Sequence, residues 1–171
     1  IYGEGWAAKE PQYRADSLAI KENISRMPGI AAFSDELRDG LRGPVMEDGV
    51  GGFLAGVPDC EESIKFGVAG GVYHPQIDYS LVNYTDSAWA LQPMQMISYV
   101  SCHDDFCLND RLKATIPDIT TEQLIALNKM AQTAVFTSQG IPFLLAGEEV
   151  MRNKKGIHNS YKSSDLVNAI D

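Results

Sequence analysis

The sequence predicts an α/β fold with a parallel sheet, and two observations lead to this prediction. Short apolar runs recur along the 171 residues, and each run stops at acidic or polar residues before a connection or a helical pattern begins. The runs end at Glu4, at Ser34-Asp35, at His103-Asp104 and at Glu148-Glu149. Four parallel strands are half of a (β/α)8 TIM barrel, and an open doubly wound sheet is the alternative.

The composition is that of a globular chain with one domain. Hydrophobic residues make up 44% and charged residues 22% of the sequence. No apolar run approaches the roughly 20 residues that span a bilayer. The formal charge of -9 disfavours nucleic acid or an anionic membrane as a partner and suits a neutral ligand. The compartment stays open.

The three cysteines, Cys60, Cys102 and Cys107, are an odd number and do not indicate a disulfide framework. Because Cys102 and Cys107 flank His103 and Asp104, a metal site has to be considered. Zinc sites usually show paired C-x-x-C or H-x-x-x-H spacing, which this sequence lacks. We therefore expect buried thiols, no bound metal and no other cofactor.

The run from Met96 to Val100 gives the clearest strand. Its β-branched and aromatic residues are typical of a strand that is covered on both faces. His103, Asp104 and Asp105 follow it, at the end of a strand where ligands bind in parallel α/β folds. The pair His103-Asp104 is therefore a candidate site. The alternative is an Asp that caps a turn and a His that bonds a backbone carbonyl.

The N-terminal part predicts one acid that a ligand can approach, one strand and one helix. Glu4 stands between two glycines, which would let a ligand approach it, although a flexible solvated turn is the alternative. The run 29–33 predicts a strand. Ser34 then predicts the cap of a helix from Asp35 to Arg42, which ends at Gly43-Pro44.

The middle of the chain is rich in glycine and then in aromatic residues. Residues 47–58 contain no G-x-G-x-x-G motif after a strand, which disfavours a nucleotide loop. Asp59 and Glu62 predict the start of a helix that runs to Gly70-Gly71. Residues 72–95 predict a long loop whose aromatic side chains either stack on a sugar or a base or pin the loop to the protein.

The C-terminal part predicts the longest helix and the last strand. Residues 106–120 read as a polar connection, after which Thr120 and Gln123 form a capping pattern. Apolar residues then recur at helical spacing until Gly140. The run 141–146 predicts a continuous apolar strand that ends at Glu148-Glu149, and the tail 151–171 is polar.

Five motifs, in this order, resemble those of type I pullulanases. They are G-E-G-W at 3–6, M-P-G-I-A at 27–31 with D-G-L-R-G at 39–43, Q-M-I-S-Y-V-S-C-H-D at 95–104, G-I-P-F-L-L-A-G-E-E at 140–149 and N-S-Y-K-S-S-D at 159–165. That family hydrolyses α-1,6 branch linkages of glucans such as pullulan, glycogen and starch, and belongs to the alpha-amylase superfamily of retaining glycoside hydrolases. The resemblance implies that residues 1–171 are the C-terminal half of a catalytic (β/α)8 barrel domain, with strands five to eight.

The resemblance also implies roles for single residues. Glu4 is similar to the family's general acid/base, kept partly protonated by apolar cover, and Asp104 is similar to the acid that stabilises the transition state. The residues expected to bind the α-glucan are His103, Trp6, Asn159 and Tyr161. For Trp6, core packing is the alternative.

Two departures from the family pattern matter. Asp105 replaces a residue that is often Asn, which places a second negative charge beside Asp104 and raises the pKa of one of the two. The family's nucleophilic Asp lies upstream of these motifs and has no counterpart in residues 1–171, so the chain alone is expected to be inactive.

Two other functions remain as alternatives, and one further expectation concerns assembly. A non-catalytic glycan-binding or structural remnant is one alternative, and a metal-dependent hydrolase that uses His74, His103 or His158 is the other. Half a barrel would also leave two sheet edges and one apolar face uncovered. We therefore expect the chain to form a homodimer.

Overall fold

The computed structural model describes residues 1–7, 9–10 and 12–170. Four parallel strands form one sheet in the order β1-β2-β3-β4, where β1 is Tyr2–Gly3, β2 is Ala31–Phe33, β3 is Met96–Ser98 and β4 is Ile141–Pro142. Neighbours in the sheet are also successive in the chain, so every crossover joins adjacent parallel strands. This confirms the predicted α/β class with a parallel sheet and the order of the four predicted strands.

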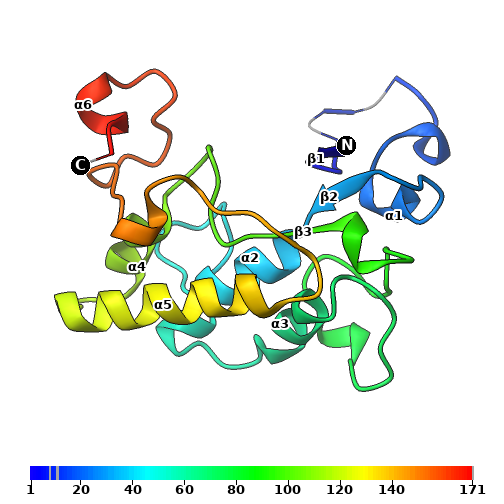
Figure 1. The fold of residues 1–171 in the computed structure, drawn as a ribbon, viewed down its shortest axis with the longest axis horizontal. Coiled ribbons are helices and arrows are strands. Elements are labelled where there is room, and N and C mark those ends of the chain that lie inside the picture. The colour runs from blue at the N-terminus through cyan, green and yellow to red at the C-terminus, as the bar shows by residue number, and fades with distance from the viewer. Residues whose placement is uncertain (8, 11, 171) are drawn as a thin grey trace.

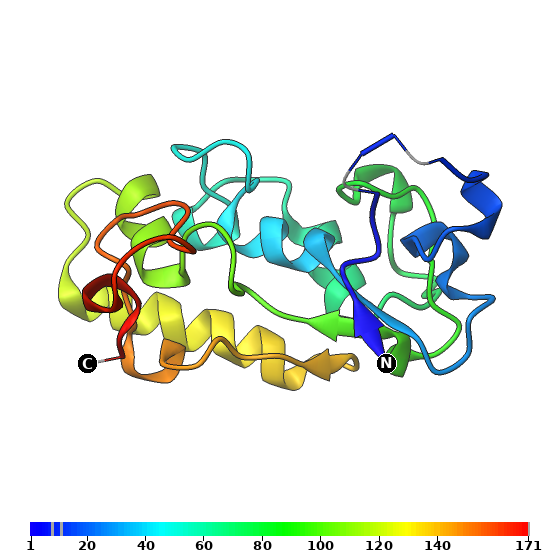
Figure 2. The same cartoon turned by 90° about the horizontal axis from the view of Figure 1, so that it is seen from above.

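The helices are α1 (Lys21–Ile24), α2 (Asp35–Arg42), α3 (Glu61–Val68), α4 (Leu108–Thr115), α5 (Thr121–Thr137) and α6 (Asp165–Asn168). Figures 1 and 2 show β1 at one side of the molecule and α6 at the other, with α5 along the lower part of Figure 1. Within the described residues, no helix combines the length and the apolar character needed to cross a membrane.

The two faces of the sheet carry different apolar clusters, because successive residues of a strand point to opposite sides. Ala32 and Met96 pack on one side with Phe66 of α3 and with Trp89. Phe33 lies on the other side, where its ring centroid is 4.8 Å from Tyr99, 5.2 Å from Phe143 and 5.8 Å from Tyr2. Helices and the 72–95 loop thus cover the first side, and an aromatic cluster lines the second.

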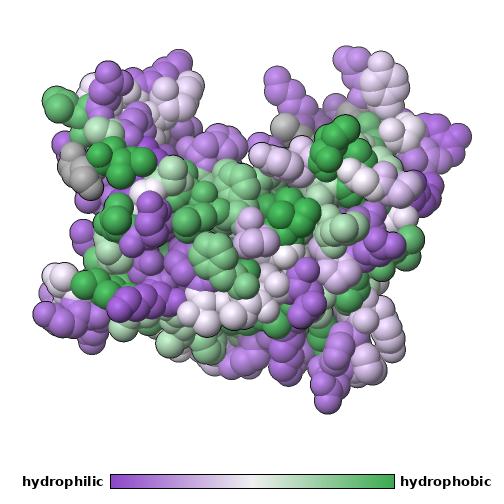
Figure 3. All heavy atoms as spheres, in the orientation of Figure 1, coloured by the Kyte–Doolittle hydropathy of each residue, from purple (hydrophilic) through white to green (hydrophobic). Residues whose placement is uncertain are grey.

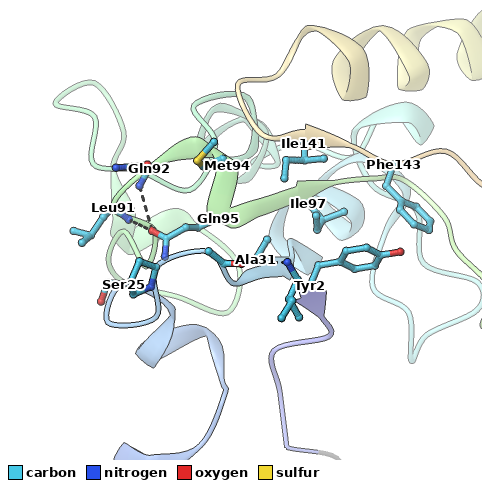
Figure 4. Close-up of a pocket in the computed structure, with 13 residues that line it drawn as sticks. Tyr2, Ser25, Ala31, Leu91, Gln92, Met94, Gln95, Ile97, Ile141 and Phe143 are labelled. Atoms are coloured by element: carbon cyan, nitrogen blue, oxygen red, sulfur yellow. Dashed lines mark hydrogen bonds between the residues drawn. The ribbon is translucent and has the colours of Figure 1, made fainter.

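The second side is only partly covered. Tyr2 is 59% exposed and Ile141 is 44% exposed, and hydrophobic residues gather in the middle of the view in Figure 3, where the strands lie in Figure 1. An open cavity of about 370 Å³ lies there, at the amino ends of the strands, with Tyr2, Ile97, Ile141 and Phe143 along it (Figure 4). We call this side of the sheet, defined by these four residues, the open face.

Helices α2 and α5 begin where the sequence predicts. Ser34 caps α2 by accepting a hydrogen bond from the Leu37 backbone N–H at 3.3 Å. Thr120 and Gln123 cap α5 through a reciprocal pair of side-chain hydrogen bonds of 2.9 and 3.2 Å. These caps depend only on residues three positions apart, which is why the sequence alone reveals them.

Three predicted boundaries are wrong. Asp59 does not cap α3, which starts at Glu61 without a side-chain cap, because Asp59 takes a left-handed conformation (φ 63°) in the preceding turn. Helix α5 ends at Thr137 rather than at Gly140. The last strand is limited to Ile141–Pro142 and is exposed, since β4 lies at the edge of the described sheet, where a proline without an N–H is tolerated.

The stretch predicted as a polar connection, residues 106–120, contains helix α4. Leu108 and Leu112, four residues apart, are fully buried against α5 and Leu54. Their spacing is the only helical signal in the segment, and the charged residues between them hide it. The 72–95 loop also has a structural role, because its Trp89 is buried and packs near Phe66, with ring centroids 6.2 Å apart.

Helices α2 and α3 pack at very close range because α3 carries a glycine at the contact. A Cβ atom added to Gly67 would lie 2.5 Å from the Cβ of Leu37, and Leu37 is fully buried. If α2 and α3 moved apart to make room for a side chain at position 67, the packing around buried Leu37 would be lost. Gly67 is therefore required for the distance between these helices and not for a special backbone angle.

Gly67→Ala is expected to lower the free energy of unfolding by about 1–2 kcal/mol. Overpacking a core lowers the free energy of unfolding by about 1–3 kcal/mol. The higher helix propensity of alanine offsets at most about 1 kcal/mol of this loss. Gly49→Ala is the matched control, since nothing lies within 4 Å of an added Cβ there. Urea unfolding at one fixed protein concentration measures both, and equal stability of the two variants would show that the helices are not in close contact.

Candidate active site

Acidic residues lie in the segments that leave the carboxyl ends of three strands. Glu4 directly follows β1, Asp104 follows β3, and Glu148 follows β4. Burial raises the pKa of the Cys102 thiol, and the negative charges of Asp104, Glu4 and Glu148 raise it further. The carboxyl ends of the parallel strands therefore bring these acids to the same end of the sheet.

His103 and Asp104 form a compact group with Cys102. The Sγ atom of Cys102 lies 3.3 Å from Nδ1 of His103, and one side-chain donor atom from each of the three residues lies within 4.8 Å of the others. Lys154 donates a hydrogen bond from Nζ to the backbone oxygen of His103 at 3.2 Å. This contact attaches the strand-end loop to the C-terminal part of the chain.

Asp105 connects the strand end to the tail. Nε2 of His158 lies 3.2 Å from Oδ1 of Asp105 and 3.2 Å from Oδ1 of Asp48. Burial raises the pKa of Asp105, and the charge of Asp104 raises it further, in the direction expected from their adjacency. Sequence reasoning considered His158 only as a metal ligand and missed this contact, since 53 residues separate the partners.

The remaining predicted site residues are more exposed. Asn159 and Tyr161 follow His158, and Tyr161 is 73% exposed. Trp6 is 36% exposed and lies along a separate open cavity of about 390 Å³ with Tyr13 and Ile20. Glu4 is exposed, so within the part of the chain that the structure describes it lacks the apolar cover expected for it.

The turn that carries Glu4 is packed against the sheet. Gly5 has a φ of 76°, and a Cβ atom there would lie 2.6 Å from the Cβ of Ala32 in β2. The backbone oxygen of Gly5 also accepts a hydrogen bond from the Lys21 N–H at 2.7 Å. Gly5 is therefore needed for the path of the chain, which favours a fixed turn over the flexible, solvated one.

Buried charged residues of α2 form a hydrogen-bond network with Tyr99, which lies between β3 and His103. Arg38 donates hydrogen bonds to the hydroxyl of Tyr99 at 2.7 Å and to Asp39 at 2.5 Å. Tyr84 donates to the same carboxylate at 2.7 Å. Burial raises the pKa of both tyrosines, so both phenols stay protonated, with Tyr84 as a donor and Tyr99 as the acceptor of the Arg38 hydrogen bond. The network ties the 72–95 loop to Tyr99, in the segment between β3 and His103.

Two further buried arginines hold the loops beside Asp105. Arg42 donates to the backbone oxygen of Phe106 at 2.5 Å. Arg111 of α4 donates to the backbone oxygens of Pro44, Glu47 and Val50 at 2.6 to 2.9 Å. Such charge-assisted bonds to carbonyls fix loops strongly when water is excluded. The sequence does not reveal them, because the acceptors are backbone atoms 60 or more residues away.

Glu148 is a buried structural acid and not an exposed strand-end acid. It is 1% exposed and accepts hydrogen bonds from Ser101 and from Nε2 of Gln132, the latter at 3.0 Å. Its backbone oxygen accepts from Asn128 at 3.2 Å. Glu148 thus joins the loop that precedes His103 to helix α5.

The stability of the chain is expected to depend on pH through Glu148. Burial raises its pKa, so the folded state binds this proton more tightly than the unfolded state. The stabilisation is complete below the ordinary carboxyl range and is lost as the pH rises through the raised pKa. Glu148→Gln should remove this slope from melting temperatures recorded between acidic and neutral pH, whereas Glu149→Gln, at an exposed position, should retain it. An unchanged slope in Glu148→Gln would contradict the assignment.

No protein-family model matches the chain. The pullulanase of Bacillus subtilis (strain 168) is 29% identical over 177 residues, which cover 100% of this chain and 22% of that protein. The crystal structure of apo pullulanase from Paenibacillus barengoltzii superposes with a TM-score of 0.87 and 38% identity, over 99% of this chain and 25% of that one. The chain resembles pullulanases over its whole length.

A second pullulanase structure extends this resemblance. The pullulanase type I from Bacillus subtilis str. 168 complexed with maltose superposes with a TM-score of 0.89 and 29% identity, over 100% of this chain and 23% of that one. The chain thus spans between a fifth and a quarter of the length of these pullulanases. Its residues align with one part of these enzymes.

The three histidines of the metal-hydrolase alternative do not meet. His74 accepts a hydrogen bond from the Gln76 N–H at 3.2 Å, His158 contacts Asp48 and Asp105, and His103 contacts Cys102. Among the described residues, the group of donor atoms close enough to share an ion contains only one histidine. A hydrolase site built from two or three of these histidines is therefore disfavoured.

Proposed function

We propose that residues 1–171 are part of a retaining glycoside hydrolase that cleaves α-1,6 branch linkages in glucans of the pullulan, glycogen and starch type. In this proposal β1 to β4 are strands five to eight of a (β/α)8 barrel, and the whole range belongs to that one catalytic domain. The observation that carries the proposal is the similarity to pullulanases along 99–100% of the chain. It is joined by the position of Glu4, His103 and Asp104 after parallel strands.

The proposed chemistry needs an acid that gives its proton to the leaving oxygen and a second carboxylate that stabilises positive charge on the sugar ring. Glu4 is exposed at its strand end and can reach a bound substrate. Asp104 is held beside His103 by the loop that Lys154 and the buried arginines fix. We assign the acid/base role to Glu4, transition-state stabilisation to Asp104 and a hydrogen bond with a sugar hydroxyl to His103.

The ligand in this proposal is an α-glucan. One pullulanase to which the chain is similar was solved in complex with maltohexaose and alpha-cyclodextrin, and another with maltose. Trp6, Asn159 and Tyr161 expose their side chains and are assigned to further contacts with the sugar chain. Aromatic rings suit such contacts, because they offer an apolar face to the ring and a polar group at its edge.

The polypeptide of residues 1–171 alone is expected to release no reducing sugar from pullulan. A retaining mechanism requires a nucleophilic carboxylate besides the acid/base, and the motifs of this chain supply none. A reducing-sugar assay with purified protein measures this. Activity that Glu4→Gln abolishes would mean that a carboxylate among residues 1–171 acts as the nucleophile.

A chimera tests the proposed function. Residues 1–171 replace the matching segment of the Paenibacillus barengoltzii pullulanase, to which 99% of the chain aligns. The chimera is expected to hydrolyse pullulan, because the host supplies the remaining strands. A chimera that melts cooperatively and binds maltotetraose without cleaving pullulan would favour the non-catalytic, glycan-binding alternative instead.

A further inference from the structure

Cys102, His103 and Asp104 combine three kinds of metal ligand at one place. The sequence argued against a metal here, because the spacing differs from that of zinc motifs. Spacing rules describe ligands on helices and ribbons, however, and residues 101–107 form an irregular loop. In this loop three consecutive side chains place one donor atom each within 4.8 Å of the others.

The separation of the first two donors matches a metal site. Ligand distances of about 2.3 Å for sulfur and about 2.1 Å for nitrogen at a tetrahedral ion place the two donors about 3.5 Å apart. Sγ of Cys102 and Nδ1 of His103 are 3.3 Å apart. An ion between them therefore needs little change in either side chain. A shift of the third donor, the Asp104 carboxylate, by about 1 Å would complete three ligands.

The surroundings favour a cation with a preference for sulfur. Asp104 offers a carboxylate oxygen within 4.8 Å of the Cys102 sulfur, and a carboxylate next to a soft sulfur ligand attracts a divalent cation. His103 is exposed and Cys102 is 7% exposed, so an ion can enter from solvent on the side of the histidine. A thiolate, an imidazole and one carboxylate suit zinc or cobalt, whereas magnesium and calcium require mostly oxygen ligands.

We propose that Cys102, His103 and Asp104 bind a divalent transition-metal ion of the zinc type, with water in the fourth position. Binding transfers the thiol proton of Cys102 to solvent and forms bonds from Sγ, Nδ1 and one carboxylate oxygen to the ion. The ion holds the side chains of His103 and Asp104. If the proposed function is correct, metal binding and sugar binding exclude each other. This consequence depends on the proposed function, but metal binding itself does not.

Cobalt provides the test, because a thiolate bound to Co²⁺ gives a charge-transfer absorption in the near ultraviolet. Adding Co²⁺ to the 171-residue protein is expected to produce this band with one equivalent bound, and Zn²⁺ should displace it while Mg²⁺ should not. Cys102→Ala should abolish the band. His103→Ala and Asp104→Asn should weaken binding by about 10-fold or more.

Control variants distinguish this site from other thiols and histidines. Cys60→Ala and His74→Ala alter residues elsewhere in the fold and should leave the band and the affinity unchanged. The proposal is wrong if no thiolate band forms, if Cys102→Ala retains it, or if Cys60→Ala removes it. Because His103 is exposed, His103→Ala should fold normally, so an unchanged affinity in that variant would also overturn the three-ligand site.

Discussion

Replacing Glu4 with Gln in the chimera is expected to lower the rate of pullulan hydrolysis by about 10²- to 10⁴-fold, the usual contribution of a general acid. Glutamine has almost the same shape but no proton to give to the leaving oxygen. Glu4 is exposed, and within the described residues its side chain makes no hydrogen bond. The melting temperature of the chimera should therefore change little on substitution. A reducing-sugar assay and a thermal melt of the same sample separate a chemical effect from a structural one.

Glu10→Gln in the chimera is the matched control. Glu10 lies on the same exposed N-terminal stretch, near Trp6, and has no role in the proposed reaction. Its rate should equal that of the unchanged chimera. If Glu4→Gln keeps full activity, the acid/base is another residue and the site assignment is wrong.

The second large effect concerns self-association of residues 1–171. The open face exposes Tyr2 and Ile141, and the cavity at its amino end also includes Leu91 (72% exposed) and Met94 (63% exposed). Strands β1 and β4 each have one neighbour in the described sheet, so their outer edges can pair. Covering several hundred Å² of apolar surface at about 25 cal/mol per Å² contributes several kcal/mol. We therefore expect a two-fold homodimer through the open face.

Ile141→Ser tests this dimer. Full burial of an isoleucine side chain contributes about 1.5–3 kcal/mol. Because Ile141 is 44% exposed, a two-fold interface that contains it twice gains about 1–3 kcal/mol from its burial, and the dissociation constant should rise by about 10-fold or more. Leu166→Ser is the control, since Leu166 is 79% exposed on α6, far from the sheet in Figure 1. Light scattering over a range of concentrations measures both. A wild-type chain that stays monomeric at high concentration and melts cooperatively would contradict the prediction.

The sequence predicted features that depend on neighbouring residues. The caps at Ser34 and Thr120 were correct because each involves residues only three positions apart. The strand before His103 was correct because its residues are buried on both faces. Helix α4 was missed because Leu108 and Leu112 are its only regularly spaced apolar residues, a pattern too short to distinguish from a connection.

Features that depend on distant residues could not be predicted. Asp39 is paired with Tyr84, 45 residues away, and Arg38 with Tyr99, 61 residues away. The sequence predicted the bounds of α2 but not that its charged residues Glu36, Arg38, Asp39 and Arg42 are buried. The apolar run before Glu148 predicted a strand up to residue 146, whereas β4 ends at Pro142, and the run could not show that Gln132 of α5 bonds the carboxyl group. In each case tertiary packing decides burial, and one sequence alone does not record it.

The most direct test of the account is how the effect of Glu4→Gln depends on the leaving group. The chimera and its Glu4→Gln variant are compared on pullulan and on α-maltosyl fluoride, whose fluoride leaves without receiving a proton. If Glu4 is the general acid, the variant's rate of pullulan hydrolysis should fall by about 10²- to 10⁴-fold. The fall in its rate on the fluoride should be smaller by a factor of at least about 10. An equal loss on both substrates, or no loss on pullulan, would contradict the assignment of Glu4 as the acid.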